Sequence, residues 1–157
     1  MMNSVIMPVH KIHPTAIVHQ NAVIGKNVEI GAYAIVGDDV VIGDGCKLYP
    51  HAVIHEHTTV GKNCTFFPGC SIGAVPQDLK FAGEHSSTII GDGCIFRECT
   101  TVNRATGEGN KTIIGNNLLM MAYTHVAHNC IVGNNVIMSN VATLAGHVTV
   151  EDRAVIG

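Results

Sequence analysis

Residues 22–45 read AVIGKN, VEIGAY, AIVGDD and VVIGDG, four consecutive units of a repeat with a period of six. The repeat starts at Ala16 and, with two interruptions, continues to Gly157. The third place is apolar in all 21 units, the first is uncharged, and the fourth is glycine in ten of them. An internal repeat this short and regular indicates a solenoid built from one recurring structural unit.

The first and third places of each unit point to the same side of an extended strand, because successive side chains alternate between its two faces. The glycine and polar places that follow supply a turn. Apolar places at i, i+2 and i+6 do not share one helical face, which excludes an amphipathic helix. We therefore predict an all-β fold, a parallel β-helix with three units in each roughly triangular coil. Residues separated by three units of an uninterrupted stretch should then stack one above the other.

Two segments interrupt the repeat. Residues 76–87, PQDLKFAGEHSS, place Asp78 and Glu84 where apolar core residues are expected, and residues 106–111, TGEGNK, do the same with Glu108. We expect both segments to be loops extruded from a corner of the coil, the second of them a plain surface excursion. Residues 1–15 are expected to form an N-terminal cap, and residues 16–157 the solenoid.

The composition narrows the classes of function. A net charge of −3 gives no indication of nucleic-acid or membrane-surface partners. No apolar run approaches the length of a transmembrane helix, and the opening MMNSVIMPVH lacks the features of a signal peptide, so we expect a cytoplasmic protein. Five of the six cysteines share the first place of the repeat and none forms a CxxC pair, which favours buried, reduced thiols.

Three histidines lie in the last uninterrupted stretch, His125 and His128 in THVAHN and His147 in ATLAGH. Gly146 follows His128 by three repeat units and should stack directly over it, with His147 one place further along. That arrangement would place a general base beside a backbone N–H that can stabilise an oxyanion. From the residues alone, solvent-exposed turn histidines and a three-histidine zinc site remain alternatives.

Three segments, GAVPQDLKFAGE (73–84), NLLMMAYTHVAHNCIVG (117–133) and ATLAGHV (142–148), carry a family resemblance. They resemble the signature sequences of the UDP-N-acetylglucosamine acyltransferases of lipid A biosynthesis, and the resemblance runs from about His13 to Gly157. It implies a left-handed β-helix that assembles as a homotrimer. It also implies transfer of an (R)-3-hydroxyacyl group from acyl carrier protein to the 3-hydroxyl of UDP-N-acetylglucosamine, without a metal or cofactor. The C-terminal helical domain of this family is expected to be absent from these residues.

The resemblance also implies roles for particular residues. His128 would be the general base, and Gly146 would donate its backbone N–H to the oxyanion. The remaining matched positions would contact the sugar nucleotide: Asp78, Lys80, His125, His147 and, more weakly, Gln77. Two departures stand out, because many relatives carry Asp at the position of Asn129 and His at that of Asn103.

The alternatives to an acyltransferase are a zinc enzyme similar to γ-class carbonic anhydrases and an inactive trimeric scaffold.

Overall fold

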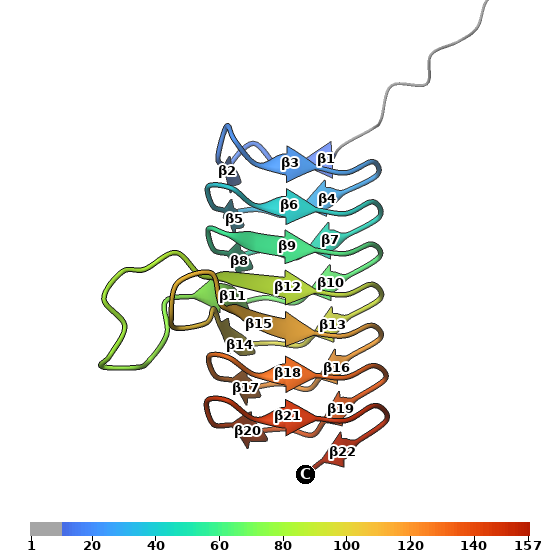
Figure 1. The fold of residues 1–157 in the computed structure, drawn as a ribbon. Helices are drawn as coiled ribbons and strands as arrows, with labels where there is room; N and C mark the ends of the chain where they lie inside the picture. Colours follow the sequence, from blue (N-terminus) through green and yellow to red (C-terminus); the bar gives the residue numbers. More distant parts are fainter. Residues whose placement is uncertain (1–10) are drawn as a thin grey trace, which may run out of the picture.

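The computed structural model describes residues 11–157, which form 22 short strands joined by tight turns. Three strands make one coil, and the coils stack into a prism (Figure 1). The front strands in Figure 1 run from left to right while the chain descends from β3 to β21, so the coil is left-handed. The prediction of a left-handed parallel β-helix is confirmed.

Every third strand along the chain joins the same parallel sheet. The first sheet contains β1 (Lys11–Ile12), β4 (Glu29–Ile30), β7 (Lys47–Leu48), β10 (Thr65–Phe66), β13 (Ile95–Phe96), β16 (Leu119–Met120), β19 (Ile137–Met138) and β22 (Val155–Ile156). The second contains β2 (Ile17–Val18), β5 (Ile35–Val36), β8 (Val53–Ile54), β11 (Ser71–Ala74), β14 (Thr101–Asn103), β17 (His125–Val126) and β20 (Thr143–Leu144). The third contains β3 (Val23–Ile24), β6 (Val41–Ile42), β9 (Thr58–Val60), β12 (Ser87–Ile90), β15 (Lys111–Ile114), β18 (Ile131–Val132) and β21 (Thr149–Val150).

The strand register follows the predicted offset of three repeat units wherever no loop intervenes, as in the pairing of Val126 with Leu144. Where a loop intervenes, the offset grows by whole repeat units. Phe66 pairs with Phe96 across the first loop, two units more than the regular offset. Val102 pairs with Val126 across the second, one unit more. The loops therefore insert extra chain between coils without changing which side chains face inward.

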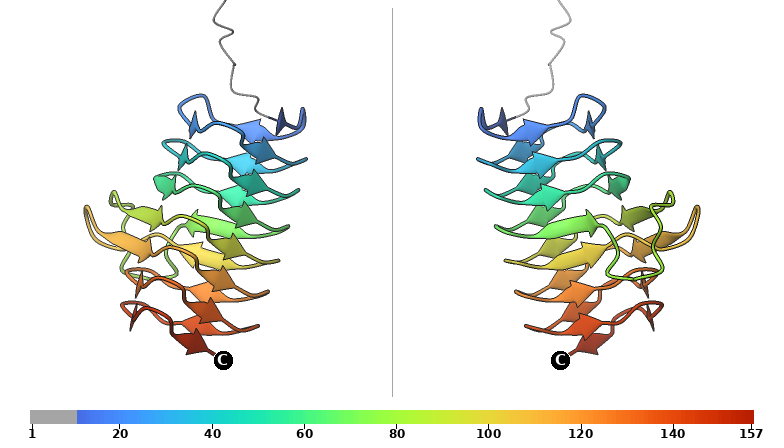
Figure 2. Two further views of the ribbon diagram at one scale, coloured as in Figure 1. Left: turned by 90° about the vertical axis from the view of Figure 1, so that its right-hand side faces the viewer. Right: turned by 90° about the vertical axis from the view of Figure 1, so that its left-hand side faces the viewer.

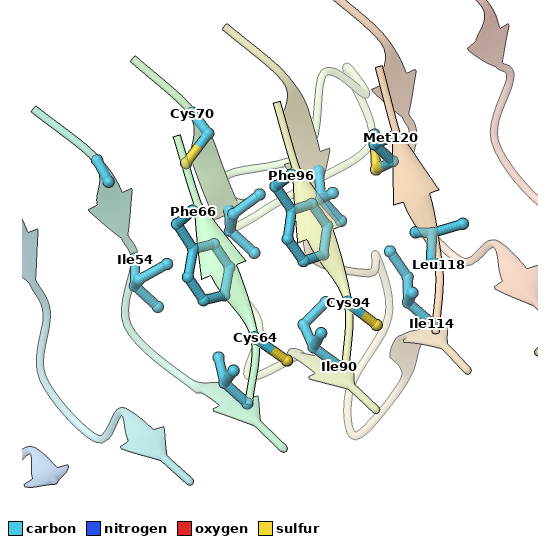
Figure 3. Close-up of a cluster of buried hydrophobic side chains, with 14 of the residues drawn as sticks. Ile54, Cys64, Phe66, Cys70, Ile90, Cys94, Phe96, Ile114, Leu118 and Met120 are labelled. Atoms are coloured by element: carbon cyan, nitrogen blue, oxygen red, sulfur yellow. The ribbon is translucent and has the colours of Figure 1, made fainter. Parts of the chain in front are cut away.

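The third-place side chains form the core. Ile30, Ile42 and Val132 are each 1% exposed, whereas those of the terminal coils, such as Val18 and Ile156, are only partly buried because each has a coil on one side. Figure 3 shows the middle of this core, where the rings of Phe66 and Phe96 stack with centroids 5.0 Å apart.

The first-place cysteines line the same interior. Cys46, Cys64, Cys70, Cys94 and Cys130 are buried and free, as predicted. Burial raises the pKa of the Cys70 thiol to about 12, which keeps it protonated at neutral pH. These thiols therefore behave as small apolar core groups.

The corners of the coil hold several non-glycine residues in the left-handed backbone conformation. Asn27, Asn63 and Asn117 adopt it with φ of 55 to 56°, which asparagine tolerates better than most residues. Val141 adopts it with φ of 68° while remaining 68% exposed. A β-branched residue in this region is a strained exception.

Two connections extend from the same side of the prism (Figures 1 and 2). The first spans residues 75–86 and the second residues 104–110, and we name them the long loop and the short loop. Strand β1 lies inside the predicted N-terminal cap and already pairs with β4. Residues 1–10 of that cap lie outside the described residues. Across residues 11–157, the structure has no helix long and apolar enough to span a membrane.

Candidate active site

An open cavity of about 590 Å³ lies between the long loop and one corner of the β-helix. Its walls are formed by Gln77, Asp78, Leu79, Lys80, His128, Gly146 and His147. Six of these residues were singled out from the sequence, and they come from three separate parts of the chain. The structure thus brings nearly the whole predicted set to one place.

His128 lies directly against the backbone of Gly146, as the predicted coil offset requires. A Cβ atom on Gly146 would be 2.6 Å from both Nε2 and Cε1 of the His128 ring, which is closer than such atoms approach in proteins. The next residue, His147, donates its backbone N–H to the carbonyl oxygen of His128 at 3.0 Å. Only glycine at position 146 therefore allows the imidazole to occupy this place.

Asn129 determines which ring nitrogen of His128 carries the proton. The Asn129 amide is oriented by Thr106, whose backbone N–H and hydroxyl both donate to Oδ1 at 2.9 Å and whose carbonyl oxygen accepts from Nδ2 at 3.0 Å. Nδ1 of His128 lies 2.9 Å from the same Oδ1, so it must be the donor. The neutral ring consequently presents the Nε2 lone pair to the cavity, as a general base requires.

Asp78 faces this nitrogen from the long loop. Its Oδ2 lies 3.8 Å from Nε2 of His128, and the two side chains are 22% and 14% exposed. Its other oxygen, Oδ1, accepts the backbone N–H of Lys80 at 3.0 Å, which fixes the carboxylate within the loop. A carboxylate and a neutral imidazole that meet across a cavity can together hold and deprotonate a hydroxyl group.

His125 is the one predicted site residue that does not line the cavity of the single chain. It lies on β17, points away from the core, and its Nδ1 is 2.7 Å from the hydroxyl oxygen of Thr101. Burial lowers its pKa, so the ring is neutral at neutral pH. Its predicted contact with a sugar nucleotide stays a prediction.

Several residues that shape the site were not identified from the sequence. Thr106 and Glu84 belong to the two loops and support the histidine and the long loop through hydrogen bonds. The expectation that residues 106–111 are a plain surface excursion is therefore wrong. The sequence did indicate the loops themselves, because Glu84 and Glu108 place charges where the repeat otherwise has an apolar core residue. It gave no indication of the contacts that these loops make. Asn103, where many relatives carry histidine, is buried and donates from Nδ2 to the carbonyl oxygen of Val75 at 3.1 Å. This difference from the family pattern therefore lies where the long loop leaves the coil.

The zinc alternative needs a group of metal-ligating side chains. Within residues 11–157, no three histidine, cysteine, aspartate or glutamate side chains gather in a way that could hold a metal ion. His128 and His147 do lie together, with ring centroids 5.2 Å apart and nearly perpendicular planes. Asp78 supplies the one carboxylate among the residues that line the cavity, and it lies 3.8 Å from Nε2 of His128.

Comparison with known proteins agrees with the fold and the motifs. The family model described as bacterial transferase hexapeptide (six repeats) matches residues 21–56 and 39–73. Over 92 residues the chain is 50% identical to the acyl-[acyl-carrier-protein]--UDP-N-acetylglucosamine O-acyltransferase of Stenotrophomonas maltophilia (strain R551-3), covering 58% of this chain and 35% of that protein. A protein of the same name from Gloeothece citriformis (strain PCC 7424) is 48% identical over 90 residues, covering 57% of this chain and 33% of that protein. The matched segment thus spans about a third of the length of these curated relatives.

Solved structures resemble this chain over nearly all of its length. LpxA from Acinetobacter baumannii superposes with a TM-score of 0.91 and 43% identity, covering 93% of this chain and 57% of that one. LpxA from Bacteroides fragilis 9343, described as a UDP-N-acetylglucosamine acyltransferase, gives a TM-score of 0.90 and 44% identity, covering 92% and 56% respectively. These similarities favour the acyltransferase interpretation over the zinc alternative.

Proposed function

We propose that the chain belongs to the hexapeptide-repeat UDP-N-acetylglucosamine acyltransferases and that it carries the catalytic β-helix of such an enzyme. The proposed reaction transfers an (R)-3-hydroxyacyl group from acyl carrier protein to the 3-hydroxyl of UDP-N-acetylglucosamine, the first step of lipid A biosynthesis. The observation that carries the proposal is the position of Nε2 of His128, which lies between Asp78 and the backbone of Gly146.

Each part of this arrangement has a task in acyl transfer. Nε2 of His128 removes the proton of the sugar hydroxyl as the hydroxyl oxygen attacks the thioester carbonyl carbon. The backbone N–H of Gly146 stabilises the negative charge that forms on the carbonyl oxygen. When the tetrahedral intermediate collapses, the C–S bond breaks and the imidazolium gives the proton to the leaving sulfur, which departs as the thiol of the carrier protein. Because the thioester is already activated, the reaction needs neither a metal nor a cofactor.

The other residues of the cavity bind and orient the acceptor. Asp78 accepts a hydrogen bond from the sugar beside the reacting hydroxyl, close to Nε2 of His128. Lys80 is exposed on the same loop and supplies a positive charge for the nucleotide diphosphate. Gln77 and His147 complete the sugar-nucleotide contacts from opposite walls of the cavity.

We further propose that the protein works as a homotrimer in the cytoplasm, with His125 contributing at the boundary between two β-helices. Tyr123, two residues before His125, is 64% exposed, and Leu119 and Met121 lie half-buried outside the core phase. Exposed apolar side chains of this kind favour an interface. His125 lies at the edge of this surface, so a neighbouring subunit would complete its surroundings.

The test is direct. The protein is incubated with an (R)-3-hydroxyacyl-carrier-protein thioester and UDP-N-acetylglucosamine, and the product is analysed by mass spectrometry. We expect an acylated sugar nucleotide, and fragmentation of the product identifies the esterified oxygen. A folded protein that forms no product with any chain length would instead support the scaffold alternative. Stoichiometric zinc in the purified protein together with carbon dioxide hydration would support the metalloenzyme.

A further inference from the structure

The two extruded loops are tied to each other by reciprocal hydrogen bonds. Oε1 of Glu84, in the long loop, accepts the backbone N–H of Gly107 at 2.7 Å. In the opposite direction, Oε2 of Glu108, in the short loop, accepts the backbone N–H of His85 at 3.1 Å. The backbone N–H of Gly109 also donates to the carbonyl oxygen of His85 at 2.7 Å. In each loop, a glutamate at the core-facing place of the repeat therefore binds the backbone of the other loop.

Glu84 also shapes its own loop. Its second oxygen, Oε2, accepts the backbone N–H of Ala82 at 2.8 Å, so one carboxylate joins both loops. The hydrogen bond from Gly107, followed by those from backbone groups of its own loop, lowers the pKa of Glu84, so it is ionised at neutral pH. Charge-assisted hydrogen bonds from backbone N–H groups are stronger than neutral ones, which suits a single side chain to this task.

The short loop in turn contacts the catalytic histidine. Thr106, next to Gly107, makes all three hydrogen bonds that orient the Asn129 amide, and Asn129 holds Nδ1 of His128. A continuous path of hydrogen bonds therefore runs from the long loop, which carries Asp78, through Glu84 and the short loop to His128. The long loop at one end of this path carries Asp78, and His128 is at the other end. The two side chains approach each other to 3.8 Å across the cavity.

Arg104, the first residue of the short loop, fixes the middle of the long loop. Nη1 of Arg104 donates to Oε1 of Glu56 at 2.7 Å, and its guanidinium carbon lies 5.6 Å from the centre of the Phe81 ring. These contacts hold the loop near residue 81 but do not reach the half that returns to the coil. The returning half is held by Glu84 and the short loop, and by the ring of His85, which packs edge-on against His57 with centroids 4.5 Å apart.

We propose that Glu84 is a positioning residue, which acts through the short loop to hold Asp78 and His128 in register for catalysis. The proposal rests on the acyltransferase function. In this proposal, the short loop holds the long loop and His128 in a fixed position relative to each other. Loops that are joined in this way move as one unit, so loosening one should loosen the other.

Hydrogen exchange tests the mechanical part of the proposal without any substrate. Glu84→Ala should increase amide exchange in peptides that cover 76–87, 104–111 and Asn129, while coils outside these regions keep wild-type protection. Glu84→Gln keeps one acceptor oxygen and should restore part of the protection. Glu29→Ala is the matched control, because Glu29 is 43% exposed on the first sheet, where its carboxylate pairs with Lys11 and Lys47. A change confined to peptide 76–87 in Glu84→Ala overturns the proposal.

Steady-state kinetics tests the catalytic part. Glu84→Ala should raise the KM for UDP-N-acetylglucosamine roughly tenfold and lower kcat, with an unchanged KM for the acyl donor. Glu84→Gln should recover much of the loss, and Glu29→Ala should match the wild type. Wild-type kinetics in Glu84→Ala contradict the proposal. If the wild-type protein itself transfers no acyl group, the proposed function fails, whereas the exchange measurement still decides whether the loops are coupled.

Discussion

Replacing Gly146 by alanine perturbs the site at its tightest contact. The added Cβ would lie 2.6 Å from Nε2 and Cε1 of His128, whereas carbon and nitrogen atoms in contact prefer about 3.5–4.0 Å. The ring must therefore move by roughly 1 Å. It is held on its other side by Asn129, so the movement breaks or bends the hydrogen bond that fixes its tautomer. A displacement of about 1 Å in a catalytic group costs on the order of 10²-fold in rate.

The effect on stability should be much smaller than the effect on rate. Overpacking costs about 1–3 kcal/mol, and the cost falls at the low end here because the clash is with the end of the His128 side chain, which can rotate away. Alanine also reduces the entropy of the unfolded chain, which offsets about 0.4–1 kcal/mol. We expect Gly146→Ala to unfold in urea with a midpoint close to that of the wild type, and to lose about 10²-fold in kcat. Steady-state kinetics and urea titration followed by circular dichroism measure the two quantities.

Gly133→Ala provides the matched control, because it creates a similar clash away from the cavity. Its Cβ would lie 2.7 Å from the backbone nitrogen of Asp152, and backbone cannot rotate away as a side chain can. We expect Gly133→Ala to lower the unfolding midpoint clearly while the folded fraction keeps the wild-type kcat. The reasoning is refuted if Gly146→Ala retains wild-type kcat, or if both variants lose rate equally.

Two further predictions concern stability. Val141→Asn should raise the free energy of unfolding by about 1 kcal/mol, because a β-branched residue is strained at φ of 68° and asparagine is not; an unchanged urea midpoint would argue against this strain. The hydrogen bond from Arg104 lowers the pKa of Glu56 below its ordinary 4.5, so the stability that this pair supplies is present above pH 4.5 and lost as the pH falls through the folded-state pKa. The difference in unfolding free energy between wild type and Glu56→Gln should therefore shrink below pH 4.5, and a constant difference down to pH 3 would contradict this assignment.

The parallel β-solenoid and one contact of the site follow from the repeat alone, whereas the left-handedness of the solenoid came from the family resemblance. The apolar third place sets which side chains face inward, as the burial of Ile30 and Val132 confirms. No insertion separates His128 from Gly146, so counting three repeat units was enough to place one over the other. Periodicity is reliable here because each coil rests on the one before it.

Contacts made by the two loops could not be found in this way. A loop is free of the coil register, so the position of Asp78 opposite His128 came only from a family resemblance. The hydrogen bond from Gly107 to Glu84 joins two loops whose separation along the chain follows no repeat rule. Asn129 was recognised as a departure from the family pattern, and only the coordinates connect its amide to Thr106. Side-chain contacts between irregular segments depend on tertiary packing and carry no periodic signal.

The most direct test of the general base is the kcat of His128→Ala, measured with an (R)-3-hydroxyacyl-carrier-protein thioester and UDP-N-acetylglucosamine. Removing a general base should lower kcat by about 10²–10⁴-fold, while calorimetry should find binding of the sugar nucleotide much less affected. His19→Ala serves as the control, because His19 is exposed and pairs with Asp38 away from the cavity. A His128→Ala protein that keeps near wild-type kcat would contradict the assignment of His128 as the base.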